Sequence, residues 1–318
     1  MARRRIVYPD AGADAPRQLT GARLARLEAL GDFALHVGTR SDADFGARLA
    51  EADGIISAWG LDAAHMRAAP RLKIISFTGL GAANFIDLDE AARLGITVTH
   101  TLSTAETVAE HTMALMLAAT RHIARLDRET RACGWNQGLQ GFDLRGKTLG
   151  LVGFGRIAQA TVPLARAFGM DVIAWTRRPE PAAHPDVAFL ALDDVLARAD
   201  VVSFHLLLTR ETTGLITDQH LRRMKPGVVV VNTARAQILD EATLIELLRT
   251  GHIAAAGLDV FAIEPLPAGH PLTRLDNVVL TPHSGFNTPE GSLAILDGAI
   301  ENLEAFYTGR PKNVATRA

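Results

Sequence analysis

The chain has 318 residues, of which 48% are hydrophobic and 21% charged, and its formal net charge is −2. This length and composition suit two globular domains with substantial apolar cores. No basic excess points to nucleic acid, because the short Arg3-Arg4-Arg5 stretch is typical of a solvated flank.

Targeting and metal-binding signals are missing from the sequence pattern. The longest apolar stretch, near residues 113–119, is far shorter than a membrane span, and residues 6–8 are too few for the apolar part of a signal peptide. The single cysteine, Cys133, excludes an internal disulfide and a multi-thiolate metal site, and the 11 histidines lack metal-ligand spacing. We therefore expect a cytoplasmic protein with no membrane segment and no bound metal.

Short apolar stretches rich in β-branched residues alternate with helical patterns over the first third of the chain. The predicted strands are residues 6–8, 33–37, 54–57, 73–77 and 96–98. The predicted helices are residues 19–30, 42–50, 61–69 and 87–94. This alternation predicts a parallel sheet covered by helices on both faces.

A second alternating series begins at Lys147. Its predicted strands are residues 148–152, 171–175, 201–205, 228–231, 254–258 and 278–280. Residues 104 to about 128 are interpreted as one long helix, apolar nearly all round, that joins two domains and forms a subunit interface. A helix at about 290–306 ends the pattern, and we expect it to pack on the first domain, which makes the second domain an insertion.

A glycine-rich turn, residues 153–158 (Gly-Phe-Gly-Arg-Ile-Ala), follows the strand at 148–152 and opens a helix. This is the dinucleotide-binding pattern with alanine at its third position. The first glycine makes the turn, the second lets the backbone approach a pyrophosphate, and the helix N-terminus attracts the anion. The strand, turn, helix and next strand together favour cofactor binding over a plain tight turn.

The residues after the strand at 171–175 bear on which cofactor binds. An NAD-binding chain usually has an acidic residue there for the ribose 2′-hydroxyl, but this chain has Thr176, Arg177 and Arg178. One hydroxyl and two guanidinium groups suit a 2′-phosphate that a carboxylate would repel. We therefore favour NADP over NAD; NAD is the alternative if the arginines are only solvated loop charges.

Three further segments follow in order: residues 232–236 (Asn-Thr-Ala-Arg-Ala), residues 257–266, and residues 281–283 (Thr-Pro-His). Together with the turn at 153–158 they resemble the D-isomer-specific 2-hydroxyacid dehydrogenases, in particular the glyoxylate and hydroxypyruvate reductases. The resemblance covers nearly the whole chain and is densest from residue 146 to residue 283.

The resemblance implies an α/β fold of two doubly wound parallel-sheet domains. A Rossmann-like cofactor domain, residues 102–284, would be inserted into a flavodoxin-like substrate domain, residues 1–101 and 285–318. It also implies a homodimer that uses NAD(P)H to reduce a small 2-keto acid to a D-2-hydroxy acid. The residues that we assign to cofactor binding are Gly153, Phe154, Gly155, Arg156, Ile157, Thr176, Arg177, Arg178, His205, Thr233, Ala234 and Asp259.

The reaction needs a group that holds the substrate carboxylate and carbonyl and a group that donates a proton. Arg235 follows a strand, where ligands of open α/β sheets bind, and its planar fork suits a carboxylate. His283 would protonate the developing alkoxide, and Glu264 would orient the imidazole and favour its charged form. Taken singly, these residues could instead be an ion-pair partner, a loop histidine and a turn cap.

The first domain offers a second anion site. The loop of residues 78–82 (Thr-Gly-Leu-Gly-Ala) follows a predicted strand, and glycine-rich loops at strand ends expose backbone N–H groups to anions. In the family this loop holds the substrate carboxylate, so Leu80 and Gly81 are candidates beside Arg235 and His283. The alternative is a plain turn into the next helix.

Two other functions stay open. One is a relative acting on another small anion: phosphite fits, whereas formate-type members lack a glutamate at the position of Glu264. The other is a non-catalytic nucleotide-sensing scaffold or corepressor on the same fold, although no long charged tail for recruiting partners is present. Departures from the family at Ala83, Ala236 and residues 284–287 leave the substrate undetermined.

Overall fold

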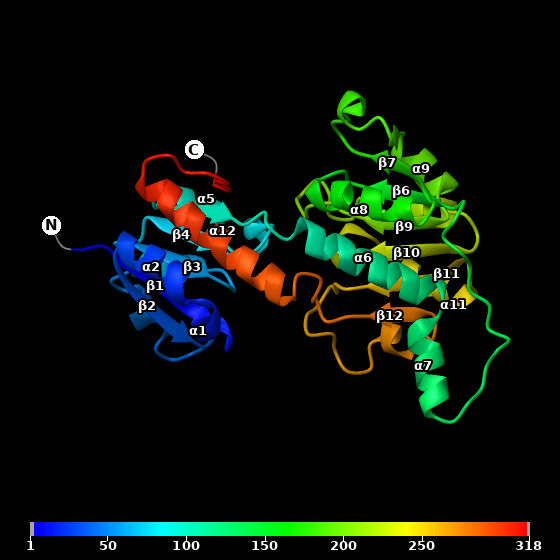
Figure 1. Ribbon diagram of the computed structural model, residues 1–318, viewed down its shortest axis with the longest axis horizontal. Coiled ribbons are helices and arrows are strands. Elements are labelled where there is room, and N and C mark those ends of the chain that lie inside the picture. The colour runs from blue at the N-terminus through cyan, green and yellow to red at the C-terminus, as the bar shows by residue number, and fades with distance from the viewer. Residues whose placement is uncertain (1–2, 317–318) are drawn as a thin grey trace. The chain divides into compact units, whose positions relative to one another are not determined.

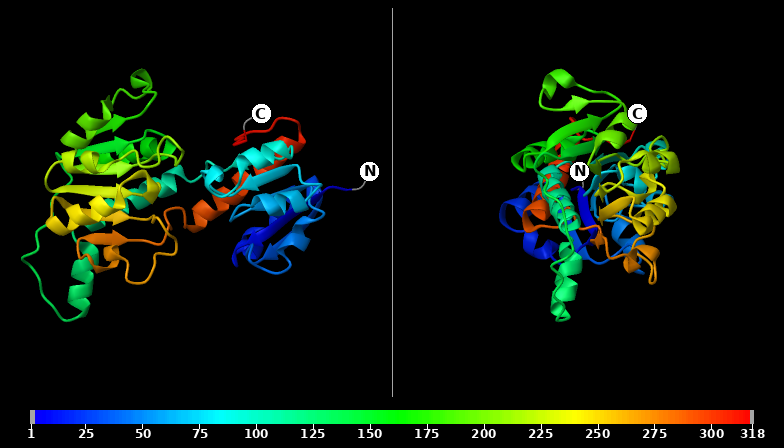
Figure 2. Two further views of the ribbon diagram at one scale, coloured as in Figure 1. Left: turned by 180° about the vertical axis from the view of Figure 1, so that it is seen from behind. Right: turned by 90° about the vertical axis from the view of Figure 1, so that its right-hand side faces the viewer.

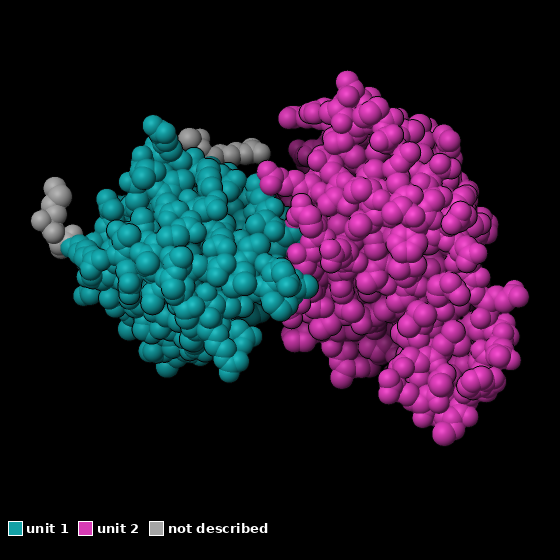
Figure 3. Space-filling view, viewed as in Figure 1, with its two compact units in different colours: residues 1–104, 288–318 teal, residues 105–287 magenta. Residues whose placement is uncertain are grey.

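The computed structural model describes residues 3–316 and divides the chain into two compact units (Figures 1 and 3). Unit 1 is Met1–Thr104 with Thr288–Ala318, and unit 2 is Ala105–Asn287. Each unit has one all-parallel sheet with helices on both faces, so the predicted α/β class with two doubly wound sheets is confirmed. Within the described part of the chain, no helix combines the length and apolarity needed to cross a bilayer.

The sheet of unit 1 has five strands in the order β2-β1-β3-β4-β5, the flavodoxin-like order. Their bounds are β1 Arg5–Ala11, β2 Asp32–Val37, β3 Gly54–Ser57, β4 Ile74–Phe77 and β5 Thr97–His100. The three inner strands β1, β3 and β4 are almost wholly buried because their side chains are apolar on both faces. Because these strands are parallel, their carboxyl ends lie along one edge of the sheet.

Helices of unit 1 cover the two faces of this sheet separately. Their bounds are α1 Ala15–Gln18, α2 Gly21–Leu30, α3 Phe45–Leu49, α4 Ala63–Ala68, α5 Leu88–Arg93 and α12 Pro289–Tyr307. One core lies under α3, α4 and α5, and a second lies under α2 and α12. Leu296, Ile300 and Leu303 of the C-terminal helix fill the second core, and Ser76 Oγ donates a hydrogen bond to the Ala299 carbonyl at 2.9 Å.

The sheet of unit 2 has seven strands in the order β12-β11-β10-β9-β6-β7-β8. Their bounds are β6 Thr148–Val152, β7 Asp171–Trp175, β8 Ala188–Phe189, β9 Val201–Phe204, β10 Val228–Asn232, β11 Ile253–Leu258 and β12 Val278–Leu280. This is the Rossmann order, with the direction of winding reversed between β6 and β9. Ligands of such sheets bind outside the strand carboxyl ends at that reversal.

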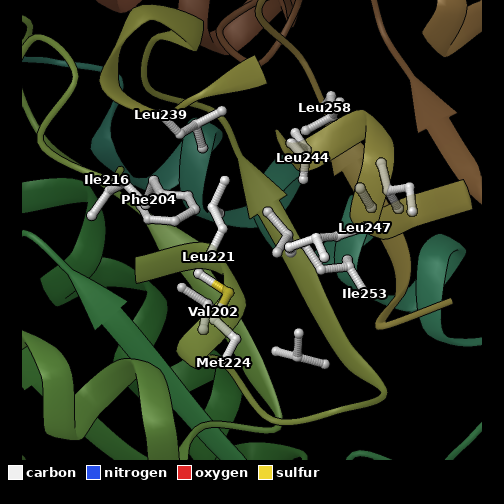
Figure 4. Close-up of a cluster of buried hydrophobic side chains, with 14 of the residues drawn as sticks. Val202, Phe204, Ile216, Leu221, Met224, Leu239, Leu244, Leu247, Ile253 and Leu258 are labelled. Atoms are coloured by element: carbon white, nitrogen blue, oxygen red, sulfur yellow. The ribbon is translucent and has the colours of Figure 1, made fainter. Parts of the chain in front are cut away.

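Helices α6 and α8 cover one face of the second sheet, and α9, α10 and α11 cover the other. Their bounds are α6 Ala105–Thr120, α8 Arg156–Ala167, α9 Leu192–Arg198, α10 Asp218–Arg223 and α11 Glu241–Thr250. Figure 4 shows the core on the second face, where Phe204 of β9 lies beside Ile216 with Leu221 and Leu239 near it. Short 3₁₀ turns occur at Ala82–Asn84, Pro181–Ala183, Ala236–Ile238 and Pro271–Arg274.

The expectation of one long helix over residues 104–128 is wrong. Helix α6 ends at Thr120, His122 has left-handed backbone with φ of 53°, and α7 then runs over Ile123–Arg131. The backbone N–H of Phe142 donates to the Thr120 carbonyl at 3.2 Å, so a returning loop satisfies the helix end. Helix α7 buries none of its residues and forms, with residues 132–141, an arm that projects from unit 2 (Figure 2).

Candidate active site

The glycine-rich turn lies at the reversal point of the second sheet. Gly153 directly follows β6 and has φ of 93°, in the left-handed region that favours glycine. A Cβ at this position would lie 2.7 Å from the carbonyl oxygen of His205, which follows the neighbouring strand β9. Glycine is therefore required here by both the backbone angle and the approach of the next strand.

The N-terminus of α8 has the features that a pyrophosphate needs. Gly155 is its N-cap residue, no side chain caps the helix, and no acidic residue lies in its first turn. A Cβ at Gly155 would meet nothing within 4 Å, whereas Ala158 is fully buried against the sheet. Exposed backbone N–H groups and the helix dipole thus suit an anion, so these residues fit a dinucleotide.

The other residues of the turn differ in environment. Phe154 is half-buried and packs edge-on against Phe189 with ring centroids 5.0 Å apart, while Arg156 is exposed at the first turn of α8 and Ile157 is half-buried. At the end of β7, Thr176 is half-buried and both following arginines are exposed. The region of the expected ribose is therefore open to solvent and carries no acidic residue directly after the strand.

Arg177 forms an ion pair with Glu211, which the sequence did not single out. The two side chains are 64% and 69% exposed, so solvent screens their attraction. Glu211 nevertheless brings a carboxylate to the guanidinium that is expected to select a 2′-phosphate.

His205 lies beside the phosphate turn as a neutral imidazole. Its Nε2 is 2.9 Å from Ser203 Oγ, and burial lowers its pKa to about 4. Its Nδ1 is buried and has no hydrogen-bond partner among the described residues. A neutral ring in this position adds no charge next to the anion site.

The structure brings His283 and Glu264 together. His283 Nδ1 lies 2.8 Å from Glu264 Oε2, and the backbone N–H of Phe261 donates to Glu264 Oε1 at 2.9 Å. The side chains are 30% and 37% exposed, so the imidazole is held yet accessible. His283 has φ of 51°, a left-handed conformation that is rare for histidine and that often marks a functional position.

Arg235 follows β10 in a loop that its own neighbours hold. Asn232 Oδ1 accepts from the Ala234 N–H at 2.9 Å, and Asn232 Nδ2 donates to the Arg235 carbonyl at 3.0 Å. Burial lowers the pKa of Arg235, and the charge of Glu264 acts in the opposite direction. Glu264 therefore lies close enough to influence Arg235 as well as to bond His283.

Asp259, one residue beyond β11, organises the loop that carries His283. Its Oδ1 accepts from Thr281 Oγ1 at 2.6 Å and from the Ser284 N–H at 2.8 Å, and its Oδ2 accepts from the Gly285 N–H at 2.9 Å. Burial opposes ionisation of Asp259, but these bonds, together with one to His111, hold its pKa below the ordinary value. A buried carboxylate thus fixes the backbone on both sides of His283.

Leu80 and Gly81 belong to unit 1, whereas all the other candidates belong to unit 2. Both follow β4 and are half-buried, and Gly81 is left-handed with φ of 75°. Thr78, at the start of this loop, donates from its backbone N–H and from Oγ1 to the Ser57 carbonyl, at 3.0 and 3.2 Å. The loops after β3 and β4 are therefore tied together at one edge of the sheet.

Asp10 holds the first of these two loops. It is fully buried one residue before the end of β1, and its carboxylate accepts from Ser57 Oγ and from the backbone N–H groups of Ala58 and Trp59. Burial raises the pKa of Asp10 above its ordinary value against the effect of these bonds.

Sequence reasoning missed two residues that contact this machinery, His111 and Thr112 of α6. His111 Nε2 lies 3.0 Å from Thr281 Oγ1, and Thr112 Oγ1 lies 3.0 Å from Thr233 Oγ1. The available signal was a polar pair directly before the apolar stretch of residues 113–119, since buried polar groups are nearly always hydrogen-bonded. Their partners lie 121 and 170 positions away, which no local pattern reveals.

The chain is similar in sequence to several proteins of known activity. The chain is 44% identical over 250 residues to D-3-phosphoglycerate dehydrogenase of Mycobacterium leprae (strain TN); the match covers 77% of this chain and 47% of that protein, about half its length. It is 42% identical over 258 residues to glyoxylate reductase of Thermofilum pendens (strain DSM 2475 / Hrk 5), with 78% and 76% covered.

Among solved structures, an acyclic imino acid reductase in complex with NADPH and D-Arg superposes with a TM-score of 0.86 at 27% identity, covering 98% of this chain and 99% of that one. Residues 113–285 match the family model described as D-isomer specific 2-hydroxyacid dehydrogenase, NAD binding domain. That match includes the glycine-rich turn, Arg235, Glu264 and His283. The chain belongs to the D-isomer-specific 2-hydroxyacid dehydrogenase family.

Proposed function

We propose that this protein is a cytoplasmic enzyme that uses NAD(P)H to reduce a small 2-keto acid to a D-2-hydroxy acid. The observation that carries the proposal is the bond of 2.8 Å between His283 Nδ1 and Glu264 Oε2, with the charge of Glu264 also acting on Arg235. An imidazole, a carboxylate and a guanidinium thus gather at the carboxyl edge of the sheet that bears the dinucleotide turn.

In the proposed mechanism, Arg235 binds the substrate carboxylate and polarises the neighbouring carbonyl. The glycine-rich turn at residues 153–158 would hold a nicotinamide cofactor, which would supply the hydride for the carbonyl carbon. Glu264 occupies Nδ1 of His283, which leaves Nε2 to donate a proton to the developing alkoxide. One hydride and one proton convert C=O to CH–OH, and solvent returns the proton to the imidazole. Leu80 and Gly81 are proposed to bind the carboxylate through their backbone.

Within this proposal the cofactor is NADPH in preference to NADH. Thr176, Arg177 and Arg178 follow β7 without an acidic residue, and the related imino acid reductase was solved with NADPH. Phe154, Arg156 and Ile157 would line the pyrophosphate. The remaining cofactor contacts that we propose are His205, Thr233, Ala234 and Asp259.

Glu211 gives a direct test of the cofactor preference. Glu211→Gln removes the carboxylate beside Arg177, so the guanidinium is released for a 2′-phosphate. We expect kcat/KM for NADPH to rise about 3-fold, in line with an exposed charge pair, and kcat/KM for NADH to stay the same. Equal changes for both cofactors would remove Arg177 from the 2′-phosphate site. Glu246→Gln, which disrupts an exposed pair with Arg222, is the matched control.

The reaction itself is tested with purified protein, NADPH or NADH, and a panel of 2-keto acids. The panel contains glyoxylate, hydroxypyruvate, pyruvate, phenylpyruvate and a branched 2-keto acid, and oxidation of the cofactor is followed by absorbance. We expect the reductase-type substrates glyoxylate and hydroxypyruvate to be used. No oxidation with any keto acid, combined with tight cofactor binding, would instead favour a nucleotide-sensing scaffold.

Arg235→Lys tests the assignment of the substrate-binding guanidinium. Lysine keeps the charge but not the planar fork, so kcat/KM should fall at least about 10-fold, the value of one charged bidentate contact. Arg223→Lys, in an exposed pair with Asp193, is the control and should leave the kinetics unchanged. If Arg235→Lys behaves like that control, Arg235 does not bind the substrate.

We also propose a homodimer formed through the arm of α7 and residues 132–141. Helix α7 buries none of its residues, and Ile123 and Trp135 are 54% and 81% exposed. Large apolar side chains on a projecting segment suit a two-fold contact with a second copy. Analytical ultracentrifugation should give twice the 34.1 kDa chain mass, and Trp135→Glu should shift the protein toward monomer.

A further inference from the structure

Two adjacent residues of α6 contact the loops of two different candidate catalytic residues. Thr112 bonds Thr233, which lies two positions before Arg235. His111 bonds Thr281, which lies two positions before His283. Two successive residues of one helix therefore bond both loops, in each case at a threonine two positions before the candidate catalytic residue.

The directions of the bonds at Thr112 can be assigned. Thr112 Oγ1 donates its single hydrogen to the Val108 carbonyl of its own helix at 2.8 Å. It therefore accepts from Thr233 Oγ1 at 3.0 Å. Thr112 is fully buried and Thr233 nearly so, with 9% exposed, so water does not replace this bond easily. The loop from Asn232 to Arg235 is thus held both internally and from α6.

The same reasoning applies to His111. Thr281 Oγ1 donates to Asp259 Oδ1 at 2.6 Å, so His111 Nε2 carries the hydrogen and donates to Thr281 Oγ1. His111 Nε2 is also 3.4 Å from Asp259 Oδ1. A Cβ added to Gly285 would lie 3.4 Å from His111 Cδ2, so the imidazole packs against the backbone just after His283.

The arrangement matters because the two catalytic side chains come from strands that are not neighbours. Arg235 follows β10 and His283 follows β12, with β11 between them. Neighbouring strands are about 4.8 Å apart, so the two strand ends are separated by about 10 Å and need a common reference. Helix α6 packs across these strands and gives both loops one common point of attachment (Figure 1).

We propose that His111 and Thr112 are a pair of positioning residues that together set the separation between Arg235 and His283. Neither residue touches the reacting atoms; each acts through a threonine. This inference rests on the proposed reductase function and adds residues that determine its rate. Reaction rates respond steeply to such geometry, since a displacement of about 1 Å can reduce them about 100-fold.

Thr112→Val is the central variant because it keeps the shape of the side chain and removes the hydroxyl. We expect kcat/KM for the keto acid to fall about 10-fold and the affinity for NADPH to fall less, because Thr233 is also a proposed cofactor contact. Thr112→Ser restores the hydroxyl and should recover the parent value. Thr120→Val is the matched control, because Thr120 is buried in the same helix and its hydroxyl donates to the Leu117 carbonyl of that helix.

His111 is tested with His111→Leu, which removes the donor, and His111→Gln, whose amide can donate in its place. We expect a fall of about 10-fold for His111→Leu and a clearly smaller one for His111→Gln. If His111→Leu does not fold, as judged by its thermal midpoint against the Thr120→Val control, the same comparison is made with His111→Asn, which is too short to reach Thr281.

The double variant decides whether the two residues act as one unit. If both bonds are needed to fix one distance, losing the second adds little, so the double variant should lose much less than the product of the two single losses. Multiplying losses, or Thr112→Val kinetics equal to those of Thr120→Val, would overturn the proposal. An inactive parent protein is a different result, because it removes the reductase function itself and this inference with it.

Discussion

Two fully buried aspartates, one in each unit, hold the loop of a neighbouring strand in the same way. Asp10 of β1 accepts from Ser57 Oγ and from two backbone N–H groups after β3. Asp259, just beyond β11, accepts from Thr281 Oγ1 and from two backbone N–H groups after β12. Asp259 also has an imidazole beside it, that of His111.

The two carboxyl groups nevertheless differ in their ionisation. Burial raises the pKa of Asp10, while the pKa of Asp259 is lowered because its hydrogen bonds outweigh the effect of burial. Similar hydrogen bonds thus surround an ionised carboxylate that is disfavoured in unit 1 and one that is favoured in unit 2. Both carboxylates accept from one hydroxyl and two backbone N–H groups, and Asp259 has the imidazole of His111 in addition, so the balance between burial and donors determines whether each charge is favourable.

The largest effect is expected for Asp259→Asn. This change leaves two backbone N–H groups and two side-chain donors with one carbonyl oxygen, so the free energy of unfolding should fall by about 3 kcal/mol. Asp10→Asn should cost about 1 kcal/mol at neutral pH, because it removes a charge that burial disfavours. Urea unfolding of both variants measures the difference, and equal losses would contradict the contrast between the two sites.

The dependence of stability on pH should have opposite signs at the two sites. The folded-state pKa of Asp10 is raised, so its contribution to stability falls as pH rises from the ordinary value of 3.8 through the raised value. The folded-state pKa of Asp259 is lowered, so its contribution is present above 3.8 and is lost as pH falls through the lowered value.

The cost of Asp10→Asn should therefore grow on acidification, and the cost of Asp259→Asn should shrink. Unfolding midpoints of parent and variants between about pH 2 and pH 7 give both trends, that of Asp259 below the ordinary carboxyl pKa and that of Asp10 above it. Parallel trends in the two variants would mean that the two carboxyl groups ionise alike.

The smallest effect is expected when one hydroxyl donor is removed from each site. Thr281→Val and Ser57→Ala should each reduce the free energy of unfolding by about 1 kcal/mol. Thr281→Val should also lower kcat/KM several-fold, because Thr281 lies two residues before His283 and bonds His111. Thermal unfolding and steady-state kinetics separate the two outcomes; a Thr281→Val enzyme with parent kinetics would limit Asp259 to a structural role.

Much of the fold could be predicted because buried parallel strands are short apolar stretches. The strands Gly54–Ser57, Thr148–Val152 and Val278–Leu280 were predicted to the residue. The two-residue strand β8 carries too little pattern to be recognised. The break after Thr120 was also missed, since neither proline nor glycine marks it and the bond that ends the helix comes from Phe142.

The candidate site likewise has a part that the sequence predicts and a part that it does not. The phosphate turn and the contact of His283 with Glu264 follow from motifs with fixed spacing, and the structure places that pair at 2.8 Å. The neutral state of His205, the ion pair of Glu211 and the bonds of His111 depend on residues remote in sequence. Such contacts are set by packing of whole elements, which local patterns do not contain.

The discontinuous construction of unit 1 has a consequence for synthesis on the ribosome. Strands β1 to β5 are made first, but the face bearing Ile6, Ile56 and Ile74 needs Leu296 and Ile300 of α12 to cover it. Unit 2 is one uninterrupted segment and can complete its own core earlier. The strands of unit 1 are therefore synthesised before unit 2 but complete their core after it, and their apolar face needs protection during that delay.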